Sequence, residues 1–239
     1  MNTRGFNPYV KWLGMSAIAA IILIVSSCKK ISETDDNPVT KLMAFNLATD
    51  KGAIDIAAGN SRITAAPLTY GSYTGGYLNI YSGQFNISAY DNGSNTAFAT
   101  ASAAFNINNY YSVFTVGDSG TYRNVIVNDM LDSLPVTTDK GYIRYINAIP
   151  DSSKPAVTVV ANGTEVINKN ESFATVSAFT AVATGDVTIT VSNGTTISAT
   201  RTISVEKNKI YSILLMGKPG SANSGSQVQI KFIVNGVVT

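Results

Sequence analysis

The feature that most constrains the fold is an internal repeat, because the sequence compares well with itself at a shift of about 100 residues. Residues 109–117 align with residues 209–217, and residues 82–89 align with residues 184–191. The order of the matching segments is kept, and the shift drifts by only a few residues, as small loop insertions would produce. The sequence therefore predicts two copies of one domain in tandem.

Each copy consists mainly of short strand-like segments. Residues 84–89 and residues 186–191 alternate apolar with polar side chains, and a period of two predicts a strand with one buried face. Residues 111–116 and 210–216 are more continuously apolar. We therefore expect these two segments to form central strands, which are buried on both faces.

Turn-forming residues separate the apolar segments. Asn and Gly occur together at 91–93, 162–163 and 193–194, and both residues adopt positive φ at low cost, which predicts hairpin turns. No segment after Thr40 combines an apolar period of 3.6 residues with helix caps. We expect an all-β fold of two tandem immunoglobulin-like β-sandwich domains, without the disulfide and buried tryptophan of antibody domains.

The same region resembles a known family. The resemblance to the family of domains of unknown function numbered 4397 lies in turns and strands at 70–83, 147–151 and 156–159. It implies immunoglobulin-like β-sandwich modules of bacterial envelope proteins, often duplicated, and it brings no activity with it. The second copy departs from the pattern, because Phe173 replaces Tyr70 and the glycines are lost. Phe179 likewise replaces Tyr77.

The N-terminus is typical of an export signal. A short basic segment with Arg4 and Lys11 precedes an apolar run at 13–25, which is too short to cross a hydrocarbon core of about 30 Å as a helix. Two small serines then precede Cys28, the only cysteine of the chain. This segment resembles the lipobox of bacterial lipoproteins, and the resemblance implies that Cys28 carries lipid after cleavage. The alternatives are a plain secretory signal or a short membrane anchor.

The segment after Cys28 is polar, lacks periodicity and contains Pro38, which predicts a flexible tether. Lys29 follows the cysteine directly. By resemblance to enterobacterial sorting rules, this residue argues for the outer membrane, with the periplasmic or surface face left open. The expected domains are a signal peptide at 1–27, the lipidated cysteine and tether at 28–40, sandwiches at 41–131 and 141–239, and a linker at 132–140.

The charge balance limits the possible partners. Removal of residues 1–27 lowers the number of Lys and Arg residues from 17 to 15, which equals the 15 acids, so the mature chain is formally neutral. A neutral chain lacks the basic footprint of a nucleic-acid-binding protein. The expected partners are therefore the membrane, reached through the N-terminal lipid, and an envelope protein or glycan.

The residue types needed for common catalytic sites are missing. The chain has no histidine, which excludes Ser-His-Asp and Cys-His sites and histidine-ligated zinc. Residues 117–120 match the sequence around the nucleophile of trypsin-like proteases, but without a histidine base we expect a loop. Residues 91–95 resemble a calcium loop without its closing Glu. We expect no catalytic residue, no metal site and no cofactor.

An aromatic segment provides the only candidate ligand site. If the side chain of Leu78 faces the sandwich core, then Tyr77, Asn79 and Tyr81 lie on the other face of the strand and form an exposed stripe. Tyrosine offers a flat apolar face and a hydroxyl group, which suit sugar or peptide binding. The alternative is that these tyrosines cover the end of the sandwich or pack against the second domain.

These observations together predict a lipid-anchored protein of the cell envelope that is a non-catalytic binding or adhesion module. One alternative is a structural spacer in a surface assembly. A more distant alternative is a glycoside hydrolase that works without histidine, because the acids of the chain could form a carboxylate pair. Four of those acids occur in turn contexts, where Asp bonds its own backbone, at Asp91, Asp129, Asp151 and Asp186.

Overall fold

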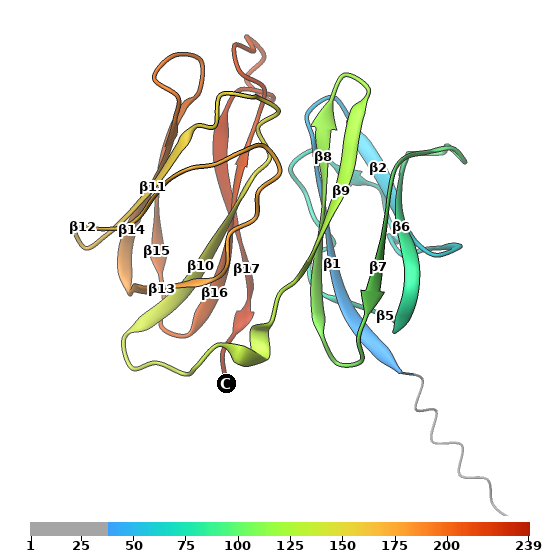
Figure 1. The fold of residues 1–239 in the computed structure, drawn as a ribbon, viewed down its shortest axis with the longest axis horizontal. Helices are drawn as coiled ribbons and strands as arrows, with labels where there is room; N and C mark the ends of the chain where they lie inside the picture. The colour runs from blue at the N-terminus through green and yellow to red at the C-terminus, as the bar shows by residue number, and fades with distance from the viewer. Residues whose placement is uncertain (1–37) are drawn as a thin grey trace, which may run out of the picture. The chain divides into compact units, whose positions relative to one another are not determined.

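The computed structural model describes residues 38–239, which form one compact unit (Figure 1). The predicted signal peptide, the predicted lipidation at Cys28 and the tether as far as Asn37 lie outside the described residues. No helix within residues 38–239 is long and apolar enough to cross a membrane.

The first sandwich contains two sheets. Its inner sheet has the strand order β5-β1-β8-β9, and its outer sheet has the order β3-β2-β6-β7 with β4 paired to β2. The strands are β1 (Val39–Ala48), β2 (Ala53–Ala58), β3 (Ser61–Arg62), β4 (Leu68–Thr69), β5 (Leu78–Tyr81), β6 (Gly83–Asp91), β7 (Ala97–Phe105), β8 (Tyr110–Asp118) and β9 (Thr121–Asn128).

The second sandwich repeats this plan after a short 3₁₀ turn, η2 (Leu131–Ser133). Its inner sheet has the order β13-β10-β16-β17, and its outer sheet has the order β12-β11-β14-β15. The strands are β10 (Lys140–Asn147), β11 (Ala156–Ala161), β12 (Thr164–Asn170), β13 (Thr180–Ala183), β14 (Gly185–Ser192), β15 (Ser198–Val205), β16 (Lys209–Met216) and β17 (Gln229–Val237).

The two copies share an unusual strand pairing. In each inner sheet the first strand of the copy pairs in parallel with a later one, β1 with β8 and β10 with β16, whereas every other pairing is antiparallel. Met43 lies opposite Ser112 in the first copy, and Arg144 lies opposite Ser212 in the second. The prediction of an all-β fold with two tandem sandwiches is therefore confirmed.

The local predictions for turns and central strands are also confirmed. Asn162 and Gly163 join β11 to β12 with φ of 49° and 76°, the left-handed pair of a tight hairpin turn. Within the segment at 117–120, Ser119 and Gly120 form the turn between β8 and β9. β8 and β16 each have a paired strand on both sides, and nearly all of their residues are buried.

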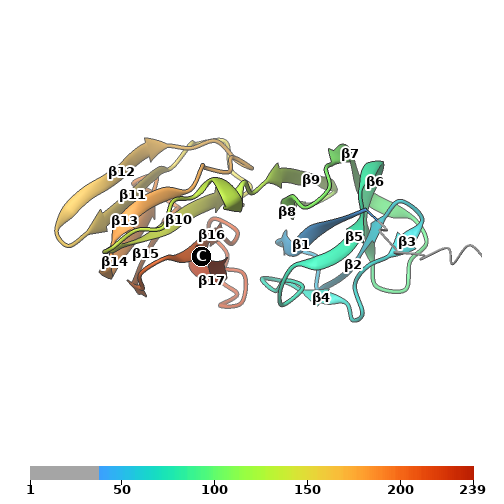
Figure 2. The ribbon, with the colours of Figure 1, turned by 90° about the horizontal axis from the view of Figure 1, so that it is seen from below.

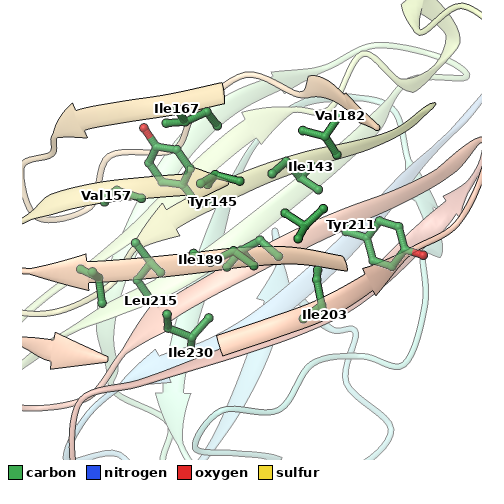
Figure 3. Packing of buried hydrophobic residues seen from close by; sticks show 14 of the residues in the cluster. Ile143, Tyr145, Val157, Ile167, Val182, Ile189, Ile203, Tyr211, Leu215 and Ile230 are labelled. Carbon is green, nitrogen blue, oxygen red and sulfur yellow. The ribbon is translucent and has the colours of Figure 1, made fainter. Parts of the chain in front are cut away.

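Each sandwich has its own apolar core between its two sheets. Figure 3 shows the core of the second sandwich, where side chains of the inner and outer sheets point toward one another, among them Ile143, Val157, Ile189, Tyr211 and Leu215. The alternation seen in the sequence arises here, because outer strands such as β11 and β14 turn every second side chain inward.

The two inner sheets face each other (Figures 1 and 2), and a third apolar layer joins them. Its buried side chains come from both copies: Met43, Phe45, Leu47, Phe114, Val116, Ile146, Ala148, Leu214, Met216 and Ile233. The inner strands are continuously apolar because one face packs on the sandwich core and the other on this layer. The limits at 41–131 and 141–239 stay predictions, and β1 begins at Val39, inside the predicted tether.

Candidate functional site

A buried ion pair lies in the layer between the two sandwiches. Arg144 on β10 and Asp129, which follows β9, approach within 2.5 Å, with side chains that are 1% and 0% exposed. The guanidinium of Arg144 also lies over the rings of Phe114 and Phe179, at 5.4 Å and 4.6 Å. Charges withdrawn from water to this degree are stable only when they are paired and hydrogen-bonded.

Hydroxyl groups complete this network. Arg144 donates to the Ser112 hydroxyl at 2.7 Å and to the Ser212 hydroxyl at 2.8 Å. Ser112 in turn donates to Asp129 at 2.7 Å, and Ser212 donates to Asn235 at 2.7 Å. The two serines occupy equivalent positions in the copies, so the network bridges the sandwiches through matched groups. Because it is sealed from solvent, its role is structural.

Tyr77 belongs to this network and does not lie on an exposed stripe. Its hydroxyl donates to Asp129 at 2.5 Å, and its ring packs edge-on against Tyr110. Burial and then the negative charge of Asp129 raise the pKa of Tyr77 well above its usual value. Tyr77 precedes β5, whereas Asn79 and Tyr81 lie on β5 and are exposed. A ligand-binding role for these residues stays a prediction.

Tyr70 lacks the partners that Tyr77 has. Its hydroxyl is buried without a hydrogen-bond partner within residues 38–239. Burial raises the pKa of Tyr70 to about 12, and the nearby Gly217 backbone only partly offsets this effect. Tyr70 packs against the layer between the sandwiches, and so does Phe173, its equivalent in the second copy.

We expect Tyr70→Phe to stabilise the fold by about 1 kcal/mol, because it removes a buried hydroxyl that no group satisfies. Phe173 already shows that the second copy uses a phenyl ring at this position. The matched control is Tyr77→Phe, which deletes a bonded hydroxyl and should destabilise by about 1–3 kcal/mol. Urea denaturation followed by circular dichroism measures both. Equal effects of the two variants would contradict this account.

An open groove lies where loops of the two sandwiches meet. It encloses about 560 Å³ and is lined by Asp118, Thr121, Arg123, Pro150, Asp151, Ser152, Lys154, Ser172 and Phe173. These residues come from the turn between β8 and β9, the loop after β10 and the loop after β12. β8 starts beside the beginning of β1 and runs parallel to it, and β10 starts at the same end of the molecule (Figure 1). The loops that follow β8 and β10, which line the groove, therefore lie at the opposite end from the start of β1. We call this site the junction groove.

Two cations, Arg123 and Lys154, line the junction groove. Arg123 and Lys154 make no salt bridge within the part of the chain that the structure describes. The guanidinium of Arg123 lies 4.8 Å from the ring centre of Phe173, across the boundary between the copies. Lys154 has φ of 52° directly before Pro155, where an extended backbone is the norm. Such strain is held by the surrounding structure and often marks functional sites.

The groove contains two acids, of which only Asp118 is paired with a cation. Asp118 forms a salt bridge with Lys218 at 2.7 Å and accepts a hydrogen bond from the Thr49 hydroxyl. Burial raises the pKa of Asp118, but these bonds outweigh it and hold the pKa below the usual value. Asp151 accepts the backbone N–H of Ser153 at 2.7 Å. The groove therefore presents two cations that make no salt bridge within residues 38–239, together with the carboxylate of Asp151, an aromatic ring and several hydroxyl groups.

This arrangement suits an anionic ligand with a flat apolar face. A guanidinium and an ammonium group donate strong hydrogen bonds to carboxylate or phosphate, and serine hydroxyls can donate to or accept from sugar hydroxyls. Residues 38–239 contain no group of three or more His, Cys, Asp or Glu side chains placed to bind a metal ion.

Sequence reasoning missed both the ion pair and the groove. The signal for the first was a single charge, Arg144, within the otherwise apolar run at 141–146. A lone charge in a central strand indicates a buried and paired group. The signal for the second was the loop at 150–155, which has a proline at each end and therefore a restricted backbone.

No curated protein matches the chain. Three solved structures share 10–13% identity with it: the TIE protein of Bacillus anthracis, family 41 carbohydrate-binding modules of streptococcal virulence factors described for alpha-glucan recognition, and a proposed cell adhesion protein of Bacteroides uniformis.

The alignments cover 76%, 80% and 84% of this chain, with TM-scores of 0.26, 0.25 and 0.25. The chain spans 34% of the length of the TIE protein and 96% and 99% of the other two. These TM-scores are too low to transfer a function. Residues 40–154 and 141–234 both match the family described as a domain of unknown function (DUF4397), which accounts for most of the chain. The chain therefore belongs to the DUF4397 family.

Proposed function

We propose that this protein is a lipid-anchored binding module of the bacterial cell envelope. In this proposal acyl chains on Cys28 hold it in the outer membrane, and it binds its ligand without catalysis. The anchor is supported by the lipobox-like sequence, in which a basic segment, an apolar run of signal-peptide length and small residues precede Cys28. Two or more acyl chains suffice for stable attachment to a bilayer.

The observation that carries the binding role is the junction groove. Arg123 and Lys154 are cations without a salt bridge within residues 38–239, beside the ring of Phe173. Leaving such cations free favours a ligand that supplies the negative charge. The ring and the hydroxyls of the groove favour a sugar over a small inorganic anion. We therefore propose a glycan that carries carboxylate or phosphate groups.

The groove also lies at the end of the molecule away from Val39, where the tether joins the fold. An anchor on Cys28 would leave the groove facing away from the attachment point. This orientation supports binding of a ligand that belongs to the surrounding envelope.

A rigid spacer is the second candidate function. The observation that favours it is the apolar layer between the inner sheets, with its buried ion pair between Arg144 and Asp129. Sandwiches joined in this way resist bending at their boundary, as a spacer in a surface assembly requires. A spacer has no need of unpaired cations in a groove, which is why we place it second.

The test uses the full chain, produced in a bacterium that acylates lipoproteins and purified in detergent. Intact mass should show a diacylglycerol on Cys28, and a Cys28→Ala variant should remain an unlipidated precursor. On an array of envelope glycans we expect binding to acidic glycans only. Arg123→Ala and Lys154→Ala should each raise the dissociation constant about tenfold, because each removes one charge-assisted hydrogen bond.

The matched control is Lys140→Ala, which removes an exposed lysine at the other end of the molecule and should leave binding unchanged. A loss of binding with Tyr81→Ala instead of Arg123→Ala would move the ligand site to β5, as the sequence predicts. If the folded protein binds no glycan at all, the groove proposal is wrong, and the spacer function takes its place.

A further inference from the structure

Large apolar side chains are exposed at one end of the molecule. Within residues 38–239, the most exposed of these side chains are Tyr81 at 65%, Met130 at 63%, Val136 at 61%, Ile107 at 56% and Val237 at 54%. They come from five separate segments of the two sandwiches. We call this set the apolar end, because the contacts described next place its members around the start of β1.

Two members lie directly beside the first residues of β1. Tyr81 on β5 pairs with Val39. Ile107 lies in the turn between β7 and β8, where the N–H of Asn108 donates to the Val39 carbonyl at 3.0 Å. Both side chains therefore flank the point at which the chain enters the fold.

Met130 lies at the same end of the first sandwich. The N–H of the preceding residue, Asp129, donates to the carbonyl of Tyr110 at 2.7 Å. Tyr110 is the first residue of β8 and pairs with Lys41, near the start of β1. Met130 itself has φ of 48°, so its backbone turns sharply as the chain leaves the first sandwich.

The other two members, Val136 and Val237, lie on the side of the second sandwich. Asn208 links their segments, because its side chain accepts the N–H of Thr137 at 2.8 Å and its carbonyl accepts the N–H of Val238 at 2.8 Å. Val136 and Val237 are the neighbours of these two bonded residues. A shallow pocket of about 290 Å³ then connects the sandwiches across this end, with Tyr110 and Leu131 from one side and Ile210 and Val237 from the other among its lining residues.

We propose that the apolar end rests on the surface of the phospholipid bilayer that holds the anchor. This inference depends on the proposed lipidation of Cys28. Ten residues separate Cys28 from Val39, and even fully extended they reach at most about 35 Å. The apolar end is therefore the part of the fold that the anchor keeps nearest to the membrane.

The chemistry of this end fits a lipid surface. Isolated valine, isoleucine and methionine side chains can enter the boundary between headgroups and acyl chains, and tyrosine is enriched at that depth. Charges of both signs surround them, with Lys41, Lys140, Lys207 and Lys209 opposed by Asp132, Asp139 and Glu206. Such a balance indicates contact through apolar burial more than through attraction to anionic lipid.

The apolar end differs from the end with the junction groove in its exposed apolar side chains. None of the five most exposed apolar side chains lies in the loops around the junction groove. A bilayer contact at the apolar end would hold the two sandwiches upright and keep the groove away from the lipid. The molecule would then have one end for the membrane and one for its ligand.

The experiment places one probe at a time on the full acylated chain in phospholipid vesicles. Cys28 is the only natural cysteine, so once it is acylated an introduced cysteine is the only free thiol. Ile107→Cys and Val136→Cys are labelled with a fluorophore, and quenching by nitroxide-bearing lipids is measured. Thr195→Cys serves as the control, because it lies in the β14–β15 loop, where Asn193 bonds Ser153 near the groove.

We expect quenching at both Ile107→Cys and Val136→Cys to be at least about threefold stronger than at Thr195→Cys, with little dependence on anionic lipid. Equal quenching at all three positions would overturn the inference while leaving the anchor intact, provided that intact mass shows acylated Cys28. Cross-linking between protein copies through Ile107→Cys, without quenching, would assign this end to a second copy and also overturn it. An unacylated Cys28 would overturn the anchor and this inference together.

Discussion

Replacing Arg144 by methionine is expected to lower the free energy of unfolding by about 3–5 kcal/mol. The reason is that Asp129, whose side chain is fully buried, would lose its counter-charge and keep only the hydroxyls of Ser112 and Tyr77 as donors. Methionine has a suitable size, because Met43 occupies the same position in the first copy, so steric strain is not the cause. Denaturation in urea followed by circular dichroism measures the change.

A second variant also removes the charge of Asp129. We expect Arg144→Met combined with Asp129→Asn to recover most of the lost stability, since the amide can still accept from Ser112 and Tyr77. The second copy already bonds Ser212 to an amide, that of Asn235. A double variant no more stable than Arg144→Met alone would contradict the argument that the unpaired charge causes the loss.

The matched control for Arg144→Met is Lys209→Met. Lys209 forms a salt bridge with Glu206 at the surface, where both side chains remain in contact with water. Exposed pairs contribute little to stability, so we expect almost no change. If the two variants had equal effects, burial of the Arg144 pair would not be the source of its importance.

Replacing Gly217 by alanine is expected to cost about 3 kcal/mol or more. Gly217 has φ of 119°, and an added Cβ would lie 2.2 Å from the carbonyl oxygen of Gln227 and 2.6 Å from the Cα of Val228. Both atoms belong to the backbone, so neither can move aside as a flexible side chain would. Gly117, at the matching place in the first copy, has φ of 139° and a Cβ site 2.2 Å from the Thr121 carbonyl oxygen.

Gly163→Ala separates the two causes of this loss. Gly163 also has a positive φ, of 76°, but no atom lies within 4 Å of its Cβ position. This variant should cost only about 1–2 kcal/mol, the penalty for the left-handed backbone alone. The same urea denaturation measures both variants. If Gly217→Ala were no less stable than Gly163→Ala, the short distance between the added Cβ and the Gln227 backbone would not be the cause of the loss.

Two features of the molecule depend on contact between the two copies. The junction groove combines side chains of both copies, so neither sandwich alone would contain it. The buried pair of Arg144 and Asp129 lies between the copies as well. A duplication that had kept the sandwiches independent would have produced neither feature, which is why the shared layer matters for function as well as for stability.

Much of the fold could be predicted from short-range patterns. Alternation at 84–89 and 186–191 gave the outer strands β6 and β14, because a strand turns successive side chains to opposite faces. The turn at Asn162 and Gly163 was predictable because its backbone angles exclude most other residues. The parallel pairing of β1 with β8 was not, since partners 69 positions apart in the sequence leave no local pattern.

In the candidate site, too, short-range patterns predict some features and long-range contacts decide others. The position of Tyr77 depends on Asp129, which is 52 residues away and has no mark in the sequence beyond a turn-like context. Arg123 and Phe173 belong to different copies, and only folding brings them within 4.8 Å. The prediction that Asn79 and Tyr81 are exposed followed from strand period alone, and both are exposed on β5.

The amino-acid sequence by itself determined the all-β class and the duplication, because each is encoded in neighbouring residues or in a repeated spacing. The tertiary structure alone decided which sheets meet, which charges become buried and where the free cations gather. These outcomes depend on contacts between distant segments, and their energies come from removing side chains from water. Which side chains are removed from water depends on the packing of the whole fold and cannot be read from any single segment.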